Sequence, residues 1–490
     1  MSAINNFIKS RKPGILPIIA FLFILVSANA FSQSQKWTYK ECLEFALEHN
    51  LGIKQNELNN EITNYNLEKA RANRLPNLNF SANHQFQFGG QVDPYTGVKS
   101  SDNNSSTNYA FSSNLTIFNG LQNVNTIKMY ASEKKSNEYD IEKQKNDMML
   151  NILRAYLQVL LDKEQVLSAE SQLQNSEALV DRAQKLVASG TKPMNDLLQV
   201  KSQLANDKYS LAQAGNSLQL AKVSLMQFME LPVDSTFEIS SPVIDDNLVL
   251  SAIMKSSRLV YDTALEVLPE IKSSATKIET SHYSYLSTKG AFFPQISLSG
   301  GLGTGYSSLR SLYNSNPVTQ TTQIGYLASN PSEKVLADQI INQLTSKSYP
   351  YGSQLKDNIS PSISIGINIP IFNRKQAKTN LSIAGVNLKN AELTLQATRN
   401  QLRKEIEQNS ADMIAARNKY LAATEQVSSS KEAYKNAEAK YNLGMMNSTD
   451  LLTEKKNLTQ AELNYIQAKY ESLFQNKISD FYLGREIVLQ

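Results

Sequence analysis

A heptad pattern of apolar residues occurs twice in this chain and constrains the fold more than any other feature. The first occurrence places an apolar residue at every seventh position: Ile152, Val159, Val166, Leu173, Val180 and Val187. The second follows 254 residues later: Ile406, Met413, Tyr420, Val427, Tyr434 and Tyr441. This spacing is typical of helices that pack along a coiled-coil seam. The sequence therefore predicts two long helices with equivalent packing surfaces.

Each of these predicted helices ends at a glycine and is followed by a second helix. The first helix, over residues 121–189, would be roughly 100 Å long and ends before Gly190. The helix after it has its own seam: Leu197, Leu204, Leu211, Leu218 and Leu225. In the second half Gly444 takes the place of Gly190, and residues 450–452 repeat the Asp-Leu-Leu of residues 196–198. We expect two helical hairpins, over residues 121–231 and 375–483.

Segments that alternate between apolar and polar residues precede each hairpin. They lie near residues 77–88 and 108–118 in the first half, and near residues 295–306 and 361–372 in the second. One side of each segment is rich in Phe, Tyr, Leu and Ile, and the other in Asn, Gln, Ser and Gly with almost no charge. This pattern predicts strands with lipid on one side and water on the other. A soluble sheet also alternates and is the competing interpretation.

The two halves differ in length at one place. Pro294 follows Pro76 by 218 residues, whereas the hairpins are related by 254, so 36 extra residues lie between the strands of the second half. We expect an extended external loop over residues 307–358, with a short helix near residues 331–344. The predicted division is a first repeat over residues 31–232, an equatorial linker over residues 233–268 and a second repeat over residues 269–490. Each repeat begins with a helix, the first running from Thr38 to about residue 75.

The N-terminus has the three parts of an export signal. Lys9, Arg11 and Lys12 form a basic region, an apolar stretch covers residues 15–26, and Ala-Asn-Ala at residues 28–30 fits a cleavage site. An anchoring transmembrane helix is the alternative, but the apolar stretch is too short for a hydrocarbon core of roughly 30 Å. We expect residues 1–30 to be a signal peptide.

Composition excludes several function classes. With 49 basic and 45 acidic residues the net charge is +4, which gives no reason to expect nucleic acid as a partner. The one cysteine, Cys42, cannot form an internal disulfide or a Cys-rich metal site, and His49, His84 and His282 are not at metal-ligand spacing. No catalytic motif is present. We expect no enzyme activity, no cofactor and no metal site.

Four membrane strands per chain would leave two open edges, and each unpaired backbone group in lipid costs several kcal/mol. Closure therefore requires several chains, and three would give 12 strands and a lumen wide enough for solutes. The predicted fold class is α+β: a trimeric 12-stranded outer-membrane β-barrel, continuous with a long periplasmic α-helical coiled-coil barrel, with each chain internally duplicated.

The duplicated elements together resemble the outer membrane efflux proteins of the TolC type. They are the strand starts at Pro76 and Pro294, Ile-Phe-Asn at residues 117–119 and 371–373, and the paired hairpin tips. The resemblance covers nearly the whole mature chain. It implies a homotrimer in outer-membrane lipid that serves as the passive exit duct of a tripartite efflux or type I secretion system. Its partners would be a periplasmic adaptor (membrane fusion) protein and an inner-membrane transporter. The alternatives are the adaptor itself and a coiled-coil structural protein.

The resemblance also implies a gate at the periplasmic tips of the hairpins. Asp450 matches the family's inner ring of acidic residues, and Tyr441 and Asp196 match a tyrosine and its acidic partner in the links that hold the gate shut. The competing interpretation is that Asp196 and Asp450 cap the second helix of each hairpin.

This sequence departs from the family's gate at two positions. Thr453 stands where the family has a second ring of aspartates, and Met446 where an arginine strengthens the link. We therefore expect a less acidic gate, held more by the packing of Met445 and Met446. The residues expected to dock the adaptor are those of the two turns: Gly190, Thr191, Lys192, Gly444 and Met445. Each glycine could instead serve only the turn.

Overall fold

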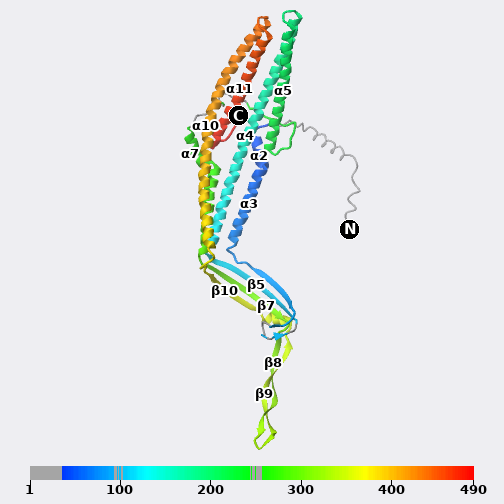
Figure 1. The fold of residues 1–490 in the computed structure, drawn as a ribbon, viewed down its shortest axis with the longest axis vertical. Helices are drawn as coiled ribbons and strands as arrows, with labels where there is room; N and C mark the ends of the chain where they lie inside the picture. The colour runs from blue at the N-terminus through cyan, green and yellow to red at the C-terminus, as the bar shows by residue number, and fades with distance from the viewer. Residues whose placement is uncertain are drawn as a thin grey trace, which may run out of the picture. The chain divides into compact units, whose positions relative to one another are not determined.

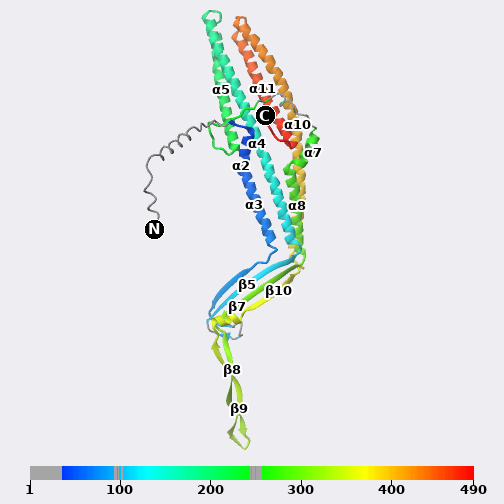
Figure 2. The ribbon, with the colours of Figure 1, turned by 180° about the vertical axis from the view of Figure 1, so that it is seen from behind.

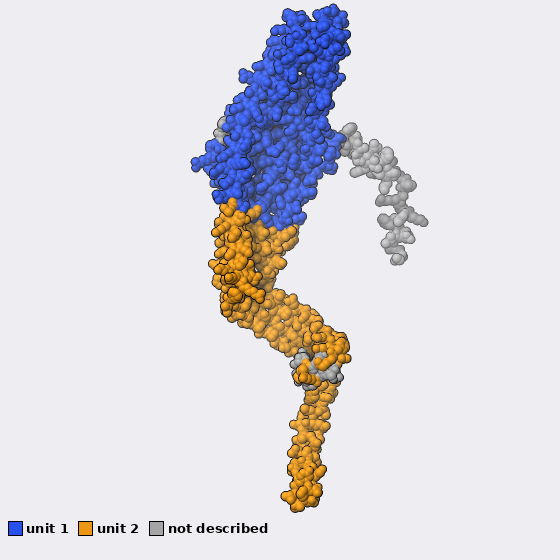
Figure 3. Space-filling view, in the orientation of Figure 1, with its two compact units in different colours: residues 1–60, 136–275, 394–490 blue, residues 61–135, 276–393 orange. Residues whose placement is uncertain are grey.

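The computed structural model describes residues 36–489 except residues 93–96, 98, 101–102, 243, 245–248 and 250–255. The predicted signal peptide lies outside the described residues. The chain divides into two compact units, coloured separately in Figure 3. Unit 1 comprises residues 1–60, 136–275 and 394–490, and unit 2 comprises residues 61–135 and 276–393.

Two helical hairpins dominate unit 1, and the first helix of each begins in unit 2 (Figures 1 and 2). The first is formed by α4 (Gln122–Ala188, 67 residues) and α5 (Met194–Phe228, 35 residues). The second is formed by α10 (Gln376–Asn442, 67 residues) and α11 (Ser448–Tyr482, 35 residues). Each helix of the second hairpin therefore begins 254 residues after its counterpart in the first. The residues at the predicted seams are buried or half-buried, and Ile152, Val159, Leu225 and Tyr441 are fully buried.

The largest apolar cluster of unit 1 lies where the first hairpin meets the N-terminal segment. It contains Tyr156 and Leu225 of the hairpin, Cys42 of α2 (Tyr39–His49) and Leu473 of α11. Beside it β1 (Lys36–Trp37) pairs in parallel with β6 (Glu238–Ile239), which lies in the predicted linker. A smaller cluster joins α10 and α11 to α7 (Ser257–Val267) and α8 (Pro269–Lys289).

The predicted single helix from Thr38 to residue 75 is wrong, because the chain forms two helices there. The Thr38–Glu41 capping box begins α2 as expected. The helix ends at His49, and α3 (Leu51–Ala72) follows. Asn50 between them is extended, and its side chain accepts a hydrogen bond of 3.0 Å from the backbone N–H of Ile53. Asparagine interrupts helices in this way, because its side chain competes for backbone donors.

Unit 2 contains a four-stranded antiparallel sheet in the order β10-β7-β5-β2. Its strands are β2 (Asn79–Gln87), β5 (Asn104–Asn119), β7 (Gln295–Ser307) and β10 (Ser360–Asn368). All four lie where alternation predicted strands, but β10 ends four residues before the predicted end at residue 372. Pro370 explains the early end, because proline has no N–H for a strand ladder.

The two faces of this sheet differ sharply in composition. Residues paired across neighbouring strands share a face, so the register assigns the side chains to the two faces, except for Ile117 at the bulge between Thr116 and Phe118 of β5. One face carries all the large apolar residues that the register assigns: Phe80, Phe86, Tyr109, Phe111, Leu115, Phe118, Ile296, Leu298, Leu302, Tyr306, Ile363, Ile365 and Ile367. The opposite face contains only Asn, Gln, Ser, Thr, Gly and Ala. Within the described residues, the edge strands β2 and β10 each pair on one side only.

The extra segment of the second half is a long β-ribbon. β8 (Ser311–Leu327) and β9 (Asn330–Ser348) pair with each other and with no other described strand, and α9 (Tyr351–Asp357) follows. The short helix predicted near residues 331–344 is wrong. Leu336, Ile340 and Leu344 are four residues apart, a spacing that fits one face of a helix and also one face of a strand. The pairing of β9 with β8 decides for the strand.

Candidate functional site

The turn of each hairpin tip is closed by a glycine in the left-handed region. Gly190 has φ of +74° and Gly444 has φ of +76°. In the first turn the N–H of Gly190 donates to Val187 O and that of Thr191 to Leu186 O, and residues 440–445 repeat both bonds. This is the usual helix end with glycine beyond the last turn. No atom crowds either Cα, so the backbone angle alone requires glycine here.

The second helix of each hairpin begins differently. The side chain of Asn447 caps α11 by accepting a hydrogen bond of 2.8 Å from the N–H of Asp450, whereas Pro193 gives α5 no side-chain cap. Asp196 and Asp450 lie in the first helical turn, one turn beyond the cap. The interpretation of both aspartates as caps is therefore wrong, although carboxylates in this turn do favour the helix dipole. Asp450 is exposed, whereas Asp196 is buried.

Tyr441 and Lys192 join the two tips. Tyr441 is fully buried, and its hydroxyl has no hydrogen-bond partner among the described residues. Burial, together with the nearby charge of Asp196, raises the pKa of this phenol. Lys192 Nζ lies 5.1 Å from the centre of the Tyr441 ring and donates a hydrogen bond of 2.6 Å to Met446 O. The same Nζ is 4.0 Å from Asp196 Oδ2, and the Lys192 side chain is only 9% exposed.

The other predicted tip residues divide by exposure. Met446 packs against the tip cluster formed by Leu179, Leu197, Tyr441 and Leu451, among others. Gly190, Thr191, Gly444 and Met445 are exposed, as a docking surface would require. Lys192, which the sequence predicts to be part of the docking surface, has its side chain between the hairpins instead. Met445 was also expected to pack at the gate, but it is 70% exposed in this chain. Thr453 is exposed and its hydroxyl donates to Thr449 O within α11.

Further polar contacts join the hairpins at the tips. Arg182 on α4 lies 3.2 Å from Glu438 and donates a hydrogen bond of 2.6 Å to the side chain of Asn442, both on α10. The side-chain oxygen of Gln199 accepts hydrogen bonds from Ser448 and Thr449 at 2.5 and 3.1 Å. Both hairpins are therefore connected by side chains close to their turns.

A buried ion pair that sequence reasoning missed connects the hairpins below the tips. Lys455 Nζ on α11 lies 2.6 Å from Asp207 Oδ2 on α5, and the two side chains are 6% and 7% exposed. Ser176 on α4, which is fully buried, donates to Asp207 and accepts from Lys455. Lys455 also donates to Gln172 O. Lys455 follows Leu451, the counterpart of the seam residue Leu197, by four positions, and this spacing could have shown that it faces inward.

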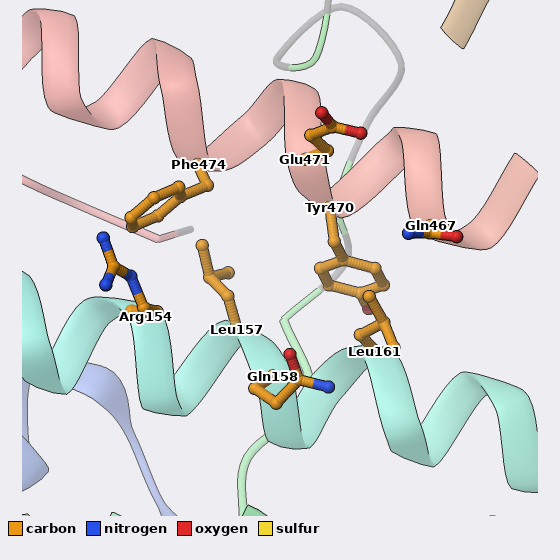
Figure 4. Close-up of a pocket in the computed structure, with 8 residues that line it drawn as sticks. All are labelled: Arg154, Leu157, Gln158, Leu161, Gln467, Tyr470, Glu471 and Phe474. Carbon is orange, nitrogen blue, oxygen red and sulfur yellow. The ribbon is translucent and has the colours of Figure 1, made fainter. Parts of the chain in front are cut away.

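A groove of about 280 Å³ lies between α4 and α11 (Figure 4). Side chains from both helices line it: Arg154, Leu157, Gln158, Leu161, Gln467, Tyr470, Glu471 and Phe474. Figure 4 shows the Arg154 guanidinium beside the Phe474 ring, 5.1 Å from its centre. Tyr470, on the same groove, donates to Glu164 of α4. Side chains of α4 and α11 therefore contact each other beside the groove, while the groove itself is not filled by side chains.

Within the described residues, no group of three or more His, Cys, Asp or Glu side chains is placed to hold a metal ion. No described helix combines the length and the apolar character needed to cross a membrane.

Comparison with known proteins identifies the family. The sequence profile of the outer membrane efflux proteins matches residues 42–229 and 260–476. The chain therefore belongs to the outer membrane efflux protein family, whose members are transport proteins rather than enzymes. A comparison with curated protein sequences gave no significant match.

Solved structures show the same fold at low sequence identity. CusC is similar with a TM-score of 0.74 and 15% identity, over 91% of this chain and 92% of CusC. The CmeC outer membrane channel of Campylobacter jejuni has a TM-score of 0.72 and 18% identity, over 91% of this chain and 86% of CmeC. The outer membrane protein VceC of Vibrio cholerae has a TM-score of 0.72 and 15% identity, over 91% of this chain and 96% of VceC.

Proposed function

We propose that this protein is one subunit of a homotrimeric exit duct in the outer membrane, with its helical hairpins in the periplasm. In this proposal three four-stranded sheets close one 12-stranded barrel, and the hairpins of three chains continue it as a helical tube. Solutes pass through it passively in a tripartite efflux or type I secretion system. A periplasmic adaptor protein and an inner-membrane transporter supply the rest of that system.

The observation that carries this proposal is the composition of the β10-β7-β5-β2 sheet. Apart from Ile117 at the bulge of β5, one face holds the large apolar side chains, and the other contains small or polar residues without a charge. A wall between lipid and a water-filled lumen needs this division, whereas a soluble sheet would expose charged residues on its wet face. The free edges of β2 and β10 would be costly in lipid, and pairing with neighbouring copies removes them. Membership of the outer membrane efflux protein family also supports a sheet that lies between lipid and water.

The hairpin tips are the proposed gate. Asp450 is exposed beside the turn, so three copies around an axis would form an acidic ring that attracts cations. Tyr441, Asp196 and Met446 belong to the contacts that keep the two tips of one chain together. The ring would have no second acidic layer, since position 453 is Thr453. Gly190, Thr191, Gly444 and Met445 form the exposed end that an adaptor would reach first.

The duct itself is tested by the mass and conductance of the intact protein. Protein extracted from outer membranes in mild detergent should have three times the mass of one chain by light scattering. In planar bilayers it should produce discrete conductance steps. A monomeric particle without channel activity would contradict the proposal, and would favour the adaptor or the structural coiled coil.

The acidic ring is tested by Asp450→Ala in single channels. Removing three like charges from a narrow ring should weaken block by multivalent cations added on the tip side and raise the conductance of monovalent salt. Glu432→Ala is a matched control, because Glu432 is exposed on α10 but farther from the turn. Unchanged block and unchanged conductance in Asp450→Ala would remove Asp450 from the gate.

A further inference from the structure

The β8–β9 ribbon is held at its base by several hydrogen bonds, and beyond the base it pairs with no other strand among the described residues. At the base Gln354 of α9 is buried and bonds both the N–H and the C=O of Ser307, the last residue of β7. The side chain of Asn358 donates a hydrogen bond of 2.6 Å to Gly305 O. The centres of the Tyr306 and Tyr351 rings lie 4.7 Å apart. The ribbon therefore starts from a fixed position at the rim of the sheet, opposite the end where the helices join (Figures 1 and 2).

One face of this ribbon carries an exposed apolar stripe. Ser315, Thr319 and Gln323 of β8 lie opposite Leu344, Ile340 and Leu336 of β9, so all six side chains share a face. Leu336, Ile340 and Leu344 are 58%, 75% and 65% exposed, and Tyr313 on the same face is 56% exposed. The apolar residues of the other face, such as Ile341 at 38%, are less exposed.

An isolated two-stranded ribbon of this length is not expected to be stable alone in water. Natural edge strands are usually protected by charged residues, yet the 17 residues of β8 include none. The whole ribbon is electrically neutral, since Glu333 and Asp338 balance Lys334 and Lys347. The face with Leu336 and Ile340 also carries Asp338, which lies between them and accepts a hydrogen bond from Thr321. This face therefore offers nothing to an anionic lipid headgroup or a polyanion, whereas its apolar side chains can pack against those of another copy.

We propose that the ribbons of three chains pack together by the Leu336–Ile340–Leu344 face and form a collar on the outer rim of the duct. The proposal rests on the trimeric duct proposed above, and its partner is a second and third copy of this chain. The ribbon is inserted between β7 and β10, and β10 is the edge strand that would pair with the neighbouring chain. The collar would thus continue the interface that closes the barrel.

The dimensions of a 12-stranded barrel are compatible with this contact. Twelve strands about 4.8 Å apart and tilted by about 40° give a circumference of roughly 75 Å, so the three ribbon bases would be about 20 Å apart. Packed sheets lie about 10 Å apart, and Ile340 is about 27 Å above the base at about 3.4 Å per residue. Each ribbon needs to lean inward by only about 6 Å at that height. One ribbon face is about 55 Å by 10 Å and is shared between two neighbours, so the three faces together would bury about 1,650 Å², or about 550 Å² for each pairwise contact. This area adds to the contact between the barrel strands and does not replace it.

The test is cysteine cross-linking of neighbouring residues on opposite faces. Ile340→Cys should give a disulfide-linked dimer on denaturing gels after mild oxidation of the full-length protein in outer membranes. Ile341→Cys is the matched control, because Ile341 is adjacent in sequence but faces away, and it should give little dimer. The native Cys42 is fully buried and should not react.

The outcomes separate this proposal from the one it rests on. A trimeric, conducting particle in which Ile340→Cys does not cross-link, or in which both variants cross-link equally, would overturn the collar and leave the duct intact. A ribbon that was protected from modification without cross-linking would show a different partner and would equally overturn it. A monomeric particle would contradict the duct itself.

Discussion

The two helical hairpins have the same helix lengths but different side chains at equivalent positions. Position 192 is lysine in the first hairpin, and its equivalent in the second is Met446, to whose carbonyl it is bonded. Lys455 is buried beside Asp207, whereas its equivalent Lys201 is exposed. The equivalent of Asp207 is Ala461, which is fully buried.

This difference shows how two hairpins with the same backbone dimensions can form specific contacts with each other. Two identical hairpins would offer each other the same charges, so a cation on one could not always find an anion on the other. Where the two hairpins differ, a lysine of one finds an acceptor on the other, as Lys455 does at Asp207 and Lys192 at Met446 O. The equal helix lengths place these residues at the same distance from the turns. The polar links are thus a property of the pair rather than of either repeat.

The largest effect is expected from breaking the buried ion pair on one side. Lys455→Met leaves the carboxylate of Asp207 buried without a positive charge beside it, with only the neutral side chains of Ser176 and Gln203 as described donors. Removing one member of a buried pair costs about 3–5 kcal/mol. Hydrogen exchange of the purified protein should show protection in α5 and α11 near these residues falling about a hundredfold to a few thousandfold.

Two further variants sharpen this prediction. Lys455→Met combined with Asp207→Leu should restore most of the protection, because replacing both charges by apolar groups is often neutral or stabilising. Lys201→Met changes the equivalent lysine at an exposed position and should stay within about 0.5 kcal/mol of the wild type. An equal loss in Lys201→Met and Lys455→Met would show that burial of the pair is not the cause.

A smaller effect is expected from the tip lysine. Lys192→Met removes the cation above the Tyr441 ring and the hydrogen bond to Met446 O. These contacts together should contribute about 1.5–3 kcal/mol, so amide protection at both turns should fall about tenfold to a hundredfold. Tyr441→Phe keeps the ring and loses only a hydroxyl without a described partner, so it should change little. If amide protection at the turns fell in Tyr441→Phe but not in Lys192→Met, the contacts of Lys192 would not be what holds the two tips together.

The smallest effect is expected at the helix starts. Asn447→Ala removes the side-chain cap of α11 and should cost about 1 kcal/mol, seen as faster exchange at the amides of residues 448–450. Pro193→Ala at the equivalent position removes no side-chain cap bond and should affect α5 less. Equal losses in both variants would contradict the assigned difference between the two caps.

Most of the fold could be predicted because its signals are local. The heptad seams and alternating strands follow from the spacing of apolar residues, and the glycine turns follow from a backbone angle that other residues avoid. The break at Asn50 was missed because one polar residue scarcely changes the helical pattern around it. At the tips the exposed turns were found, but Lys192 was placed on the surface, because sequence does not show which way a long side chain folds.

The sequence by itself determined the two hairpins and the strands with one apolar and one polar face, since each depends on residues that are close together in the chain. Only the tertiary structure decided between helix and strand for residues 331–344, because the spacing of Leu336 and Ile340 suits both and the pairing with β8 is not local. It also decided the contact of Asp207 with Lys455. Those residues are 248 positions apart, and only the packing of one hairpin against the other brings their charges together away from water.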